Sequence, residues 1–482
     1  MNYKMMGRFV AQIVMIEGVF LLPALSISIV YGEWASVRGF LWALGVMIAV
    51  SGTLFALCRK AGAIFGAREG LACVGIGWIA LSMLGCVPFV ISGAIPSYID
   101  ALFEIVSGFT TTGSSILADV ESLPKGLLYW RSFSHWVGGM GVLVFLLALA
   151  PTGGHGFTLH LLRAESPGPD VGKLVPKIRK TATILYCIYI VMTVLNFLFL
   201  LAGDMSWLEA LCTAFGTAGT GGFGVKNDSM ASYSPYIQNV TTVFMLLFGV
   251  NFSCYYLLLL GNFRSVFKDE ELRTYVALVL GIILLITLDI RGMYATLEET
   301  VRHASFQVAS IVSTSGFVTT DFDLWPTFSK GLLMLLLLTG ACAGSTCGGF
   351  KIARMLLVLK SLGRNIRQVL NPRRVLVVRN NGRTVSQQVL DNTNAYLAAY
   401  VVIIVVSHLL LSMEGFSFGT TISAVLTCFN NVGPGFEAVG PTCNFSGFSN
   451  FSKLVLTLDM LAGRLEIFPI LALFSKDTWL RK

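Results

Sequence analysis

Residues 430–436 read Asn430-Asn431-Val432-Gly433-Pro434-Gly435-Phe436, and this stretch is the last of four that decide the fold. Small and hydroxylated residues surround a glycine in each. The other three are Thr110-Thr111-Thr112-Gly113-Ser114, Ala218-Gly219-Thr220-Gly221-Gly222-Phe223 and Ser313-Thr314-Ser315-Gly316-Phe317. With Gly113, Gly221, Gly316 and Gly433 as the central glycines, the spacings are 108, 95 and 117 residues (221−113, 316−221 and 433−316). A unit of about a hundred residues therefore occurs four times.

Each glycine-centred stretch follows an apolar segment that is too short to cross a membrane. We predict these segments to be re-entrant half-helices, at Ala101–Phe109, Leu208–Phe215, Thr300–Ile311 and Gly419–Phe429. Irregular backbone at membrane depth is tolerated only where it lines a watery cavity or is buried in protein. One such stretch alone would be an ordinary turn. Four of them can supply a ring of carbonyl oxygens for a dehydrated monovalent cation, and helix C-termini directed at the ion would favour its charge.

The composition places the whole chain in a membrane. Of its 482 residues, 55% are hydrophobic and 12% are charged, and the mean hydropathy is +0.75. Such a chain exposes too much apolar surface to remain soluble. Glu17 interrupts the first apolar run, which is too long for a signal peptide, and we assign this residue no role. The predicted helices cover about 9–31, 39–57, 71–94, 132–150, 183–203, 236–261, 274–290, 331–350, 394–413 and 452–474.

The charge distribution predicts the topology. The net charge is +8. With a cytoplasmic N-terminus, Lys and Arg dominate the inside connections and Asp and Glu the outside ones, which places both termini in the cytoplasm. An acidic outer face would concentrate cations. The outside acids are Asp100, Glu104, Glu209, Asp228, Glu298, Asp321 and Glu437. The ten cysteines form no CxxC pair, so we expect free thiols and neither disulfides nor a zinc site.

Two features inside predicted helices are candidate gate elements. The run from Gly340 to Gly349 holds four glycines in ten residues, which destabilises a helix. Either close helix packing or a loop that breaks the helix explains this run. Arg464 lies in the middle of the last helix, where a charge needs water or a partner. It either pairs with Asp459 or Glu466, or places its charge in the pore as a barrier to cations.

The longest inside connection is strongly basic. Residues 374–386 resemble a β-hairpin whose turn is Asn381-Gly382. This linker either contacts anionic lipid or docks a cytoplasmic regulator. We find no Gly-x-Gly-x-x-Gly after a strand and no Walker A motif, so the chain is expected to hold no organic cofactor itself. Between 351 and 383 the basic residues are Lys351, Arg354, Lys360, Arg364, Arg367, Arg373, Arg374, Arg379 and Arg383.

The sequence resembles the Trk/Ktr/HKT superfamily of potassium transporters, and within it the TrkH/TrkG-type membrane subunits. Besides the third and fourth stretches, the resemblance rests on Gly344–Arg354 and Gly463–Phe468. It implies an all-α membrane protein with four pseudo-symmetric helix–pore-loop–helix repeats, preceded by two extra helices. The implied boundaries are 1–66 for the two N-terminal helices, 67–165, 166–265 and 266–355 for repeats one to three, 356–392 for the basic linker and 393–482 for repeat four.

The resemblance also implies a site. It places the central glycines in a potassium-selectivity filter, although the second stretch allows two alignments that differ by one residue. The implied filter residues are Thr111, Thr112, Gly113, Thr220, Gly221, Ser315, Gly316, Asn431, Val432 and Gly433. An intramembrane loop facing Arg464 would obstruct the pore below them. The implied gate residues are Gly344, Ser345, Thr346, Gly348, Gly349, Lys351 and Arg464.

The resemblance further implies potassium as the transported ion, the bacterial inner membrane as the location, and a homodimer with a pore in each subunit. The expected partner is an RCK-type, TrkA-like regulatory subunit that binds NAD or ATP. A cation symporter on the same fold is the alternative. An enzyme is disfavoured because the histidines show no catalytic spacing, and an inverted-repeat carrier because the repeats all run in the same sense.

Overall fold

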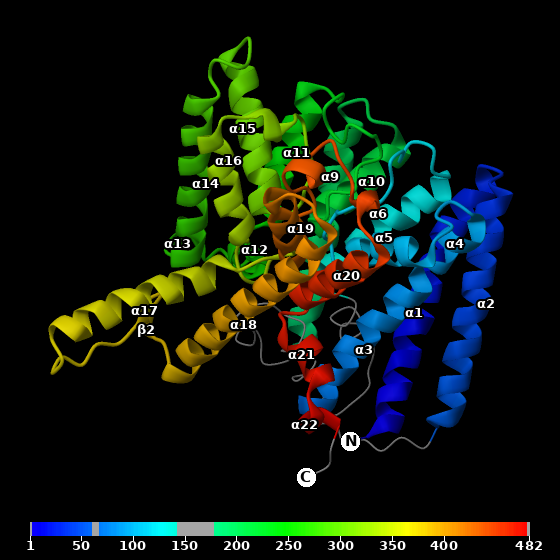
Figure 1. Ribbon diagram of the computed structural model, residues 1–482, viewed down its shortest axis with the longest axis horizontal. Helices are drawn as coiled ribbons and strands as arrows, with labels where there is room; N and C mark the ends of the chain where they lie inside the picture. Colours follow the sequence, from blue (N-terminus) through cyan, green and yellow to red (C-terminus); the bar gives the residue numbers. More distant parts are fainter. Residues whose placement is uncertain (1, 60–66, 142–177, 480–482) are drawn as a thin grey trace.

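The computed structural model describes residues 2–59, 67–141 and 178–479, which are mainly helical (Figure 1). The expected boundary at 165/166 lies outside these residues. Two helices, α1 (Tyr3–Val30) and α2 (Trp34–Leu57), pack against each other at the N-terminus. They confirm the predicted extra helix pair. Glu17 of α1 is buried beside Gly85.

Four short helices precede the glycine-centred stretches, as predicted. They are α5 (Tyr98–Phe109), α10 (Trp207–Gly219), α15 (Leu297–Val312) and α19 (Phe418–Asn430). A Ser or Thr side chain caps each one by accepting a hydrogen bond from the third backbone N–H of the helix. The four caps are Ser97, Ser206, Thr296 and Ser417.

Longer helices flank the short ones. Those before them are α3 (Ala67–Gly85) with α4 (Val87–Ser92), α9 (Ile178–Leu201), α14 (Glu270–Asp289) and α18 (Gln387–Leu411). Those after them are α6 (Lys125–Gly139), α11 (Pro235–Phe248), α16 (Thr327–Leu338) and α20 (Asn450–Arg464).

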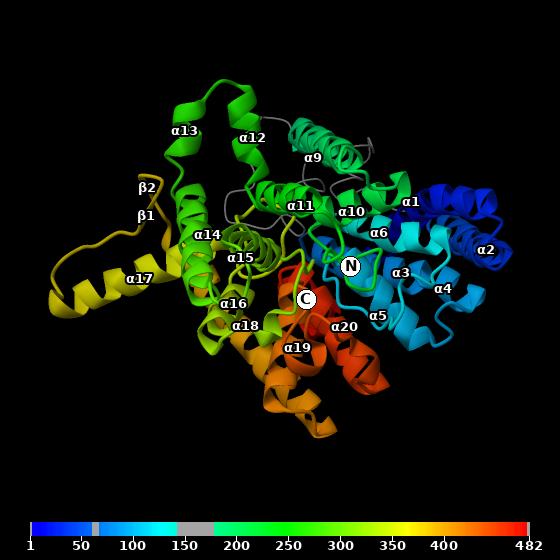
Figure 2. The same cartoon turned by 90° about the horizontal axis from the view of Figure 1, so that it is seen from above.

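The short helices and the helices that follow them form a closed series of contacts. In chain order α5 contacts α6, then α10, α11, α15, α16, α19 and α20 follow, and α20 returns to α5. Seen from above, the four short helices surround a common centre (Figure 2). The first short helix is thereby brought next to the last long one, although more than 300 residues separate them in the chain.

Three helices predicted to be continuous are broken. The 236–261 helix is wrong as a single element, because α11 meets α12 (Phe252–Leu259) at a bend of 89°. The 331–350 helix ends at Leu338, and irregular backbone leads to α17 (Ile352–Leu370). The 452–474 helix divides into α20 and α21 (Phe468–Phe474). Apolar composition predicted each span, but tertiary contacts at the breaks replace the hydrogen bonds of the helix.

Six helices among the described residues are long and apolar enough to cross a membrane, or seven if the bent α11–α12 pair counts as one. The predicted spans 236–261, 331–350 and 452–474 are broken helices, and residues 142–150 of the predicted 132–150 span lie outside the described residues. Further short elements are α13 (Phe263–Phe267), α22 (Lys476–Trp479), and the 3₁₀ turns η1 (Phe322–Leu324), η2 (Ser412–Glu414), η3 (Glu437–Val439) and η4 (Phe445–Gly447). All ten cysteines are free, as expected.

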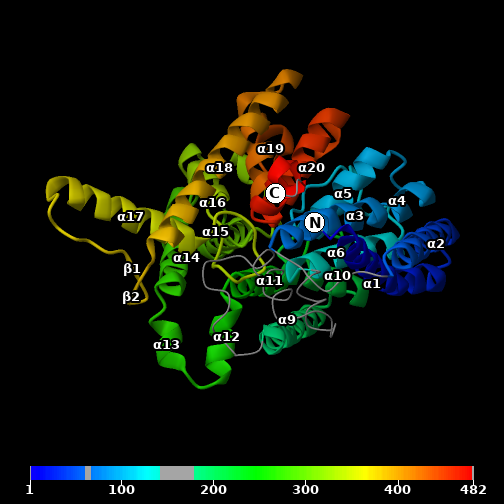
Figure 3. The ribbon, with the colours of Figure 1, turned by 90° about the horizontal axis from the view of Figure 1, so that it is seen from below.

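The basic linker extends away from the helical body (Figure 3). It consists of α17 and a hairpin of β1 (Arg379–Asn380) and β2 (Arg383–Thr384). The turn residues Asn381 and Gly382 have φ values of 49° and 74°, which is the conformation a tight two-residue hairpin requires. The hairpin prediction is confirmed.

Candidate functional site

The four glycine-centred stretches fold into turns with the same backbone conformation. In each turn the first and third residues have positive φ and the second does not. The first-position residues are Thr111, Thr220, Thr314 and Asn431, with φ of 54–56°, and the third-position residues are Gly113, Gly222, Gly316 and Gly433, with φ of 76–99°. The N–H of each middle residue also bonds the carbonyl five residues earlier, at 2.8–2.9 Å, and the middle residues are Thr112, Gly221, Ser315 and Val432.

This conformation corrects the alignment of the second turn. Gly221 was expected to be its central glycine, but Gly221 occupies the middle position and Gly222 has the positive φ. The sequence allowed two alignments because the second turn and the residue before it contain three glycines. Only the backbone angles distinguish these two alignments. The other expected glycines, Gly113, Gly316 and Gly433, are equivalent to Gly222.

The turns close into a ring. A Cβ atom on Gly113 would overlap the carbonyl oxygen of Gly221, and one on Gly222 would overlap that of Ser315. A Cβ on Gly316 would overlap the Val432 carbonyl, and one on Gly433 would lie 2.9 Å from the Thr112 carbonyl. Each third-position glycine therefore lies against the middle-position carbonyl of the next turn. No side chain fits at any of the four junctions.

Buried oxygens gather around this ring. The Thr112 hydroxyl lies 2.7 Å from that of Thr110 and accepts a 3.0 Å hydrogen bond from the Asn431 amide. Ser313 and Ser315 are paired in the same way at 2.8 Å. The hydroxyl of Thr111 and the amide oxygen of Asn431 are buried and have no hydrogen-bond partner among the described residues. Backbone carbonyls, hydroxyls and an amide are thus the groups available to an ion.

A buried ion pair, missed in the sequence, supports the first two turns. Arg131 of α6 donates to Glu104 of α5 at 2.6 Å, and both side chains are almost fully buried. Glu104 also accepts from the Ile116 backbone at 2.9 Å, while Arg131 donates to the Gly224 carbonyl at 3.1 Å. Glu104 was expected to be one of the acids of the outer face. That prediction is wrong because its charge is neutralised inside the protein.

His135 is a second residue whose role the sequence did not reveal. It is fully buried, with Nδ1 2.7 Å from the Gly108 carbonyl and Nε2 accepting from the Phe223 backbone at 3.3 Å. It therefore joins the end of α5 to the second turn.

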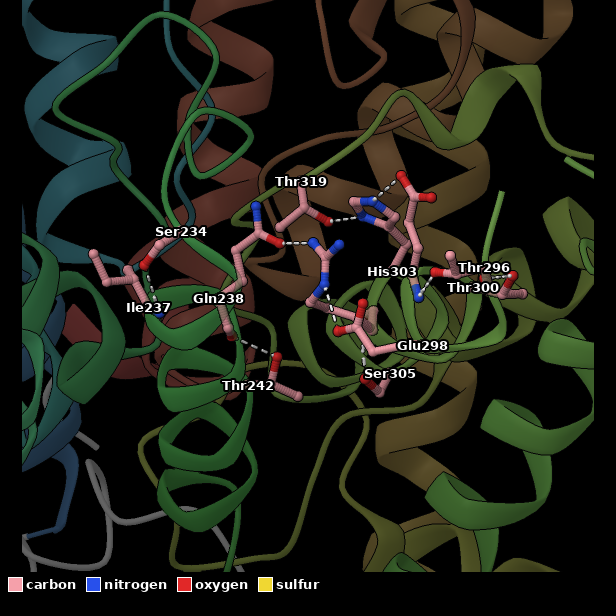
Figure 4. Close-up of polar contacts among 12 residues, drawn as sticks. Ser234, Ile237, Gln238, Thr242, Thr296, Glu298, Thr300, His303, Ser305 and Thr319 are labelled. Carbon is pink, nitrogen blue, oxygen red and sulfur yellow. Dashed lines mark hydrogen bonds and ion pairs between the residues drawn. The ribbon is translucent and has the colours of Figure 1, made fainter. Parts of the chain in front are cut away.

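Polar contacts between α11 and α15 support the third turn from outside (Figure 4). Gln238 accepts a hydrogen bond from Arg302, which also pairs with Glu298 at 3.0 Å. His303 Nδ1 lies 2.9 Å from the hydroxyl of Thr319, two residues after the turn. These contacts fix the direction in which the chain leaves the third turn.

An acidic side chain lies near the fourth turn. Glu437 follows this turn by a few residues and accepts hydrogen bonds from Ser417 and Thr420. These bonds hold the pKa of the Glu437 carboxyl below its ordinary value. The group is therefore an anion at neutral pH.

The glycine-rich segment, residues 339–351, lies directly against the ring. Gly348 N–H donates to the Thr314 hydroxyl at 2.8 Å, and a Cβ on Gly348 would lie 2.6 Å from the Asn430 carbonyl. On the other side, backbone hydrogen bonds of 3.0–3.1 Å join the segment to the bend between α11 and α12. The segment is therefore a loop inside the helical body, and close helix packing does not explain its glycines.

The expected gate residues are gathered in and around this segment. Ser345 donates to the Cys342 carbonyl at 2.7 Å, and buried Lys351 donates to that of Cys347. Gly344 and Gly349 both have a φ of 71°, a conformation that glycine adopts without strain. Thr346 is fully buried, and its carbonyl faces Arg464.

Arg464 joins three parts of the chain. Its guanidinium donates to the Thr346 carbonyl at 2.7 Å and to the carbonyls of Gly138 and Gly139 at 2.5 and 2.6 Å. The two acids considered as its partners have other contacts. Glu466 pairs with Arg354, and Asp459 accepts from Ser407 at 2.8 Å. Arg464 thus faces the glycine-rich segment.

Comparisons with known proteins agree with this architecture. Residues 38–479 match the family model TrkH, described as a cation transport protein. The Trk system potassium uptake protein TrkH of Escherichia coli K12 is 32% identical over 99% of this chain and 100% of its own, and TrkG of that strain is 31% identical over 95% of both. The crystal structure of the potassium transporter TrkH from Vibrio parahaemolyticus has a TM-score of 0.89 and 30% identity, covering both chains completely. These are transport proteins and not enzymes. The chain belongs to the TrkH family of cation transport proteins.

Proposed function

We propose that this protein takes up potassium ions through a channel-like pore whose selectivity filter is the ring of four turns. The relatives named above are potassium uptake proteins and transporters. The described turns contribute backbone carbonyl and hydroxyl oxygens as ligands. Among the described residues, no group of His, Cys, Asp or Glu side chains gathers in a way that could hold a metal ion.

The ring of glycine-to-carbonyl contacts carries this proposal. The same contact occurs at all four junctions, which is what four helix–pore-loop–helix repeats around one axis require. A dehydrated potassium ion needs several carbonyl oxygens in place of its water shell. The C-terminal ends of α5, α10, α15 and α19 lead into the ring, so their negative dipole ends favour a cation there. We assign the filter to Thr111–Gly113, Thr220–Gly222, Thr314–Gly316 and Asn431–Gly433.

The glycine-rich segment and Arg464 form the gate in this proposal. The segment lies against the filter turns, and the positive charge of Arg464 lies beside it. A cation leaving the filter would meet both. The membrane potential supplies the driving force, about 2.3 kcal/mol per charge for each 100 mV.

The assembly belongs to the same proposal. We infer a homodimer in the bacterial inner membrane, with both termini in the cytoplasm and a pore in each subunit. A cytoplasmic RCK-type subunit that binds NAD or ATP would regulate the gate. The basic linker, which projects from the helical body, is the surface that we propose for its docking (Figure 3).

Substitution of Gly433 by serine tests the filter. We expect Gly433→Ser to reduce discrimination of potassium over sodium in uptake by transporter-deficient cells, because a Cβ there crowds the Thr112 carbonyl and strains a backbone with φ of 99°. Gly415→Ser is the matched control. Gly415 has a φ of 79° and open space around it, so selectivity should be unchanged. Unaltered selectivity in Gly433→Ser would refute the filter assignment.

A coupled symporter on the same fold is the alternative. Electrical recording from the purified protein in planar bilayers distinguishes the two. A channel-like pore gives currents that reverse at the potassium equilibrium potential. A fixed ratio between potassium and a second cation would shift the reversal potential and favour the symporter.

A further inference from the structure

The turn of the cytoplasmic hairpin is anchored to the beginning of α14. Asn381 donates its amide to the Asp269 carboxylate at 2.8 Å, and its amide oxygen accepts from the Glu270 backbone at 2.8 Å. The Asn381 backbone N–H donates to the Glu270 carboxylate at 3.1 Å. One exposed asparagine therefore makes three hydrogen bonds to two adjacent residues of another part of the chain.

The next residue along the chain, Glu271, holds the glycine-rich segment. Its Oε1 accepts hydrogen bonds from the backbone N–H groups of Ala343, at 2.6 Å, and Ala353, at 3.1 Å. Ala343 lies within the segment, and Ala353 is the second residue of α17, which follows the segment. The Glu271 side chain is buried, so these two hydrogen bonds are shielded from water. Glu271 thus ties the glycine-rich segment to the beginning of α17.

The hairpin is packed against α17. Lys360 of α17 pairs with Glu270 and donates to the Arg379 carbonyl at 3.0 Å. Leu357, Val378 and Leu390 form a small apolar cluster between α17, the hairpin strand and α18. The hairpin is therefore joined both to the start of α14 and to α17, the helix that follows the glycine-rich segment.

We propose that the triplet Asp269-Glu270-Glu271 couples the cytoplasmic hairpin to the gate. Asp269 and Glu270 hold the hairpin, and Glu271 holds the segment. Because the three residues begin a single helix, they cannot shift independently. A cytoplasmic protein that binds the displaced hairpin more tightly than the anchored one would release the segment. This inference rests on the proposed function, in which the segment is the gate, and makes Asn381 and Glu271 positioning residues.

Two native cysteines allow a test that does not depend on ion flux. Cys347 and Cys342 lie in the segment and are each 1% exposed. The full-length protein in proteoliposomes would be treated with N-ethylmaleimide. Mass spectrometry would then measure the rate at which each cysteine is modified. We expect Glu271→Ala to speed the modification of Cys347 about tenfold, since the hydrogen bonds that the carboxyl oxygen accepts from two backbone N–H groups are lost. Glu271→Gln should give a smaller increase, because its amide oxygen still accepts a hydrogen bond.

The decisive variant is Asn381→Ala. Asn381 is exposed, so its replacement leaves the core intact. We expect it also to speed the modification of Cys347, and the double variant with Glu271→Ala to be no faster than Glu271→Ala alone. Asn380→Ala is the matched control in the same hairpin, since the Asn380 side-chain oxygen has no hydrogen-bond partner among the residues that the structure describes. An unchanged rate in Asn381→Ala, an equal increase in Asn380→Ala, or additive effects in the double variant would overturn the coupling.

The coupling hypothesis and the filter assignment can be refuted independently of each other. If Asn381→Ala speeds labelling while Gly433→Ser leaves selectivity intact, the coupling stands and the filter assignment is wrong. If Gly433→Ser alters selectivity while Asn381→Ala leaves labelling unchanged, the filter stands and the hairpin has no control over the segment.

Discussion

At the scale of the residue, the function depends on which atoms face the ring and the segment beneath it. Glycine occupies the third position of each turn because a neighbouring carbonyl fills the space of a Cβ. Two long side chains, Lys351 and Arg464, are assigned to the gate. Arg464 donates to carbonyls of two different segments. Replacing these residues therefore changes geometry and charge at defined atoms.

Substitution of Arg464 by alanine should raise the basal flux of cations. The Thr346 carbonyl loses a charged donor, so the glycine-rich segment is held less firmly, and the barrier to cations is removed. We expect at least about a tenfold increase in rubidium flux into proteoliposomes. Arg464→Lys keeps the charge with fewer donors and should give an intermediate flux. A flux no greater than that of the unsubstituted protein in Arg464→Ala would contradict a gating role.

At the scale of the element, helix ends and breaks position the site. Four capped short helices end in the turns, and three of the long helices that follow them are interrupted at the level of the glycine-rich segment or Arg464. Ile467, a β-branched residue, has a φ of 66° at the break between α20 and α21. Such strain persists only where surrounding contacts impose it.

The pair of Glu104 and Arg131 joins two of these elements and is expected to be essential to their packing. Arg131→Met alone should lower stability by about 3–5 kcal/mol, because it leaves Glu104 buried without its ion-pair partner. The combined variant Glu104→Gln and Arg131→Met should be more stable than Arg131→Met. Thermal unfolding in detergent measures this difference. Equal midpoints for the single and double variants would show that the unpaired charge does not govern stability.

At the scale of the whole molecule, the direction of the chain in the membrane decides which end of the pore receives the ion. We expect the turns to face outward and the basic linker to face the cytoplasm. Exposed Cys443 lies beyond the fourth turn on the predicted outer side. An impermeant maleimide should label it in right-side-out spheroplasts, and Cys443→Ser should remove this signal. Labelling of Cys443 only after membrane permeabilisation would reverse the topology.

The sequence by itself determined the membrane environment, the extra helix pair, the four short helices and their turns, and the hairpin. These features depend on local patterns: apolar length, Ser or Thr caps, and glycines beside small residues. The repeated spacing located the central glycines of the first, third and fourth turns. In the second turn it pointed to Gly221, one residue before the actual central glycine, Gly222.

Only the tertiary structure decided the alignment of the second turn, the closed order of the ring, the helix breaks, the burial of Glu104 and His135, and the anchoring of Asn381. Each of these depends on backbone atoms that meet across long chain separations. An apolar run has the same composition whether its helix continues or breaks. An acidic residue is predicted to be exposed unless its buried ion-pair partner is known, and the sequence does not identify that partner. Contacts between distant segments, which no local pattern encodes, therefore completed the site.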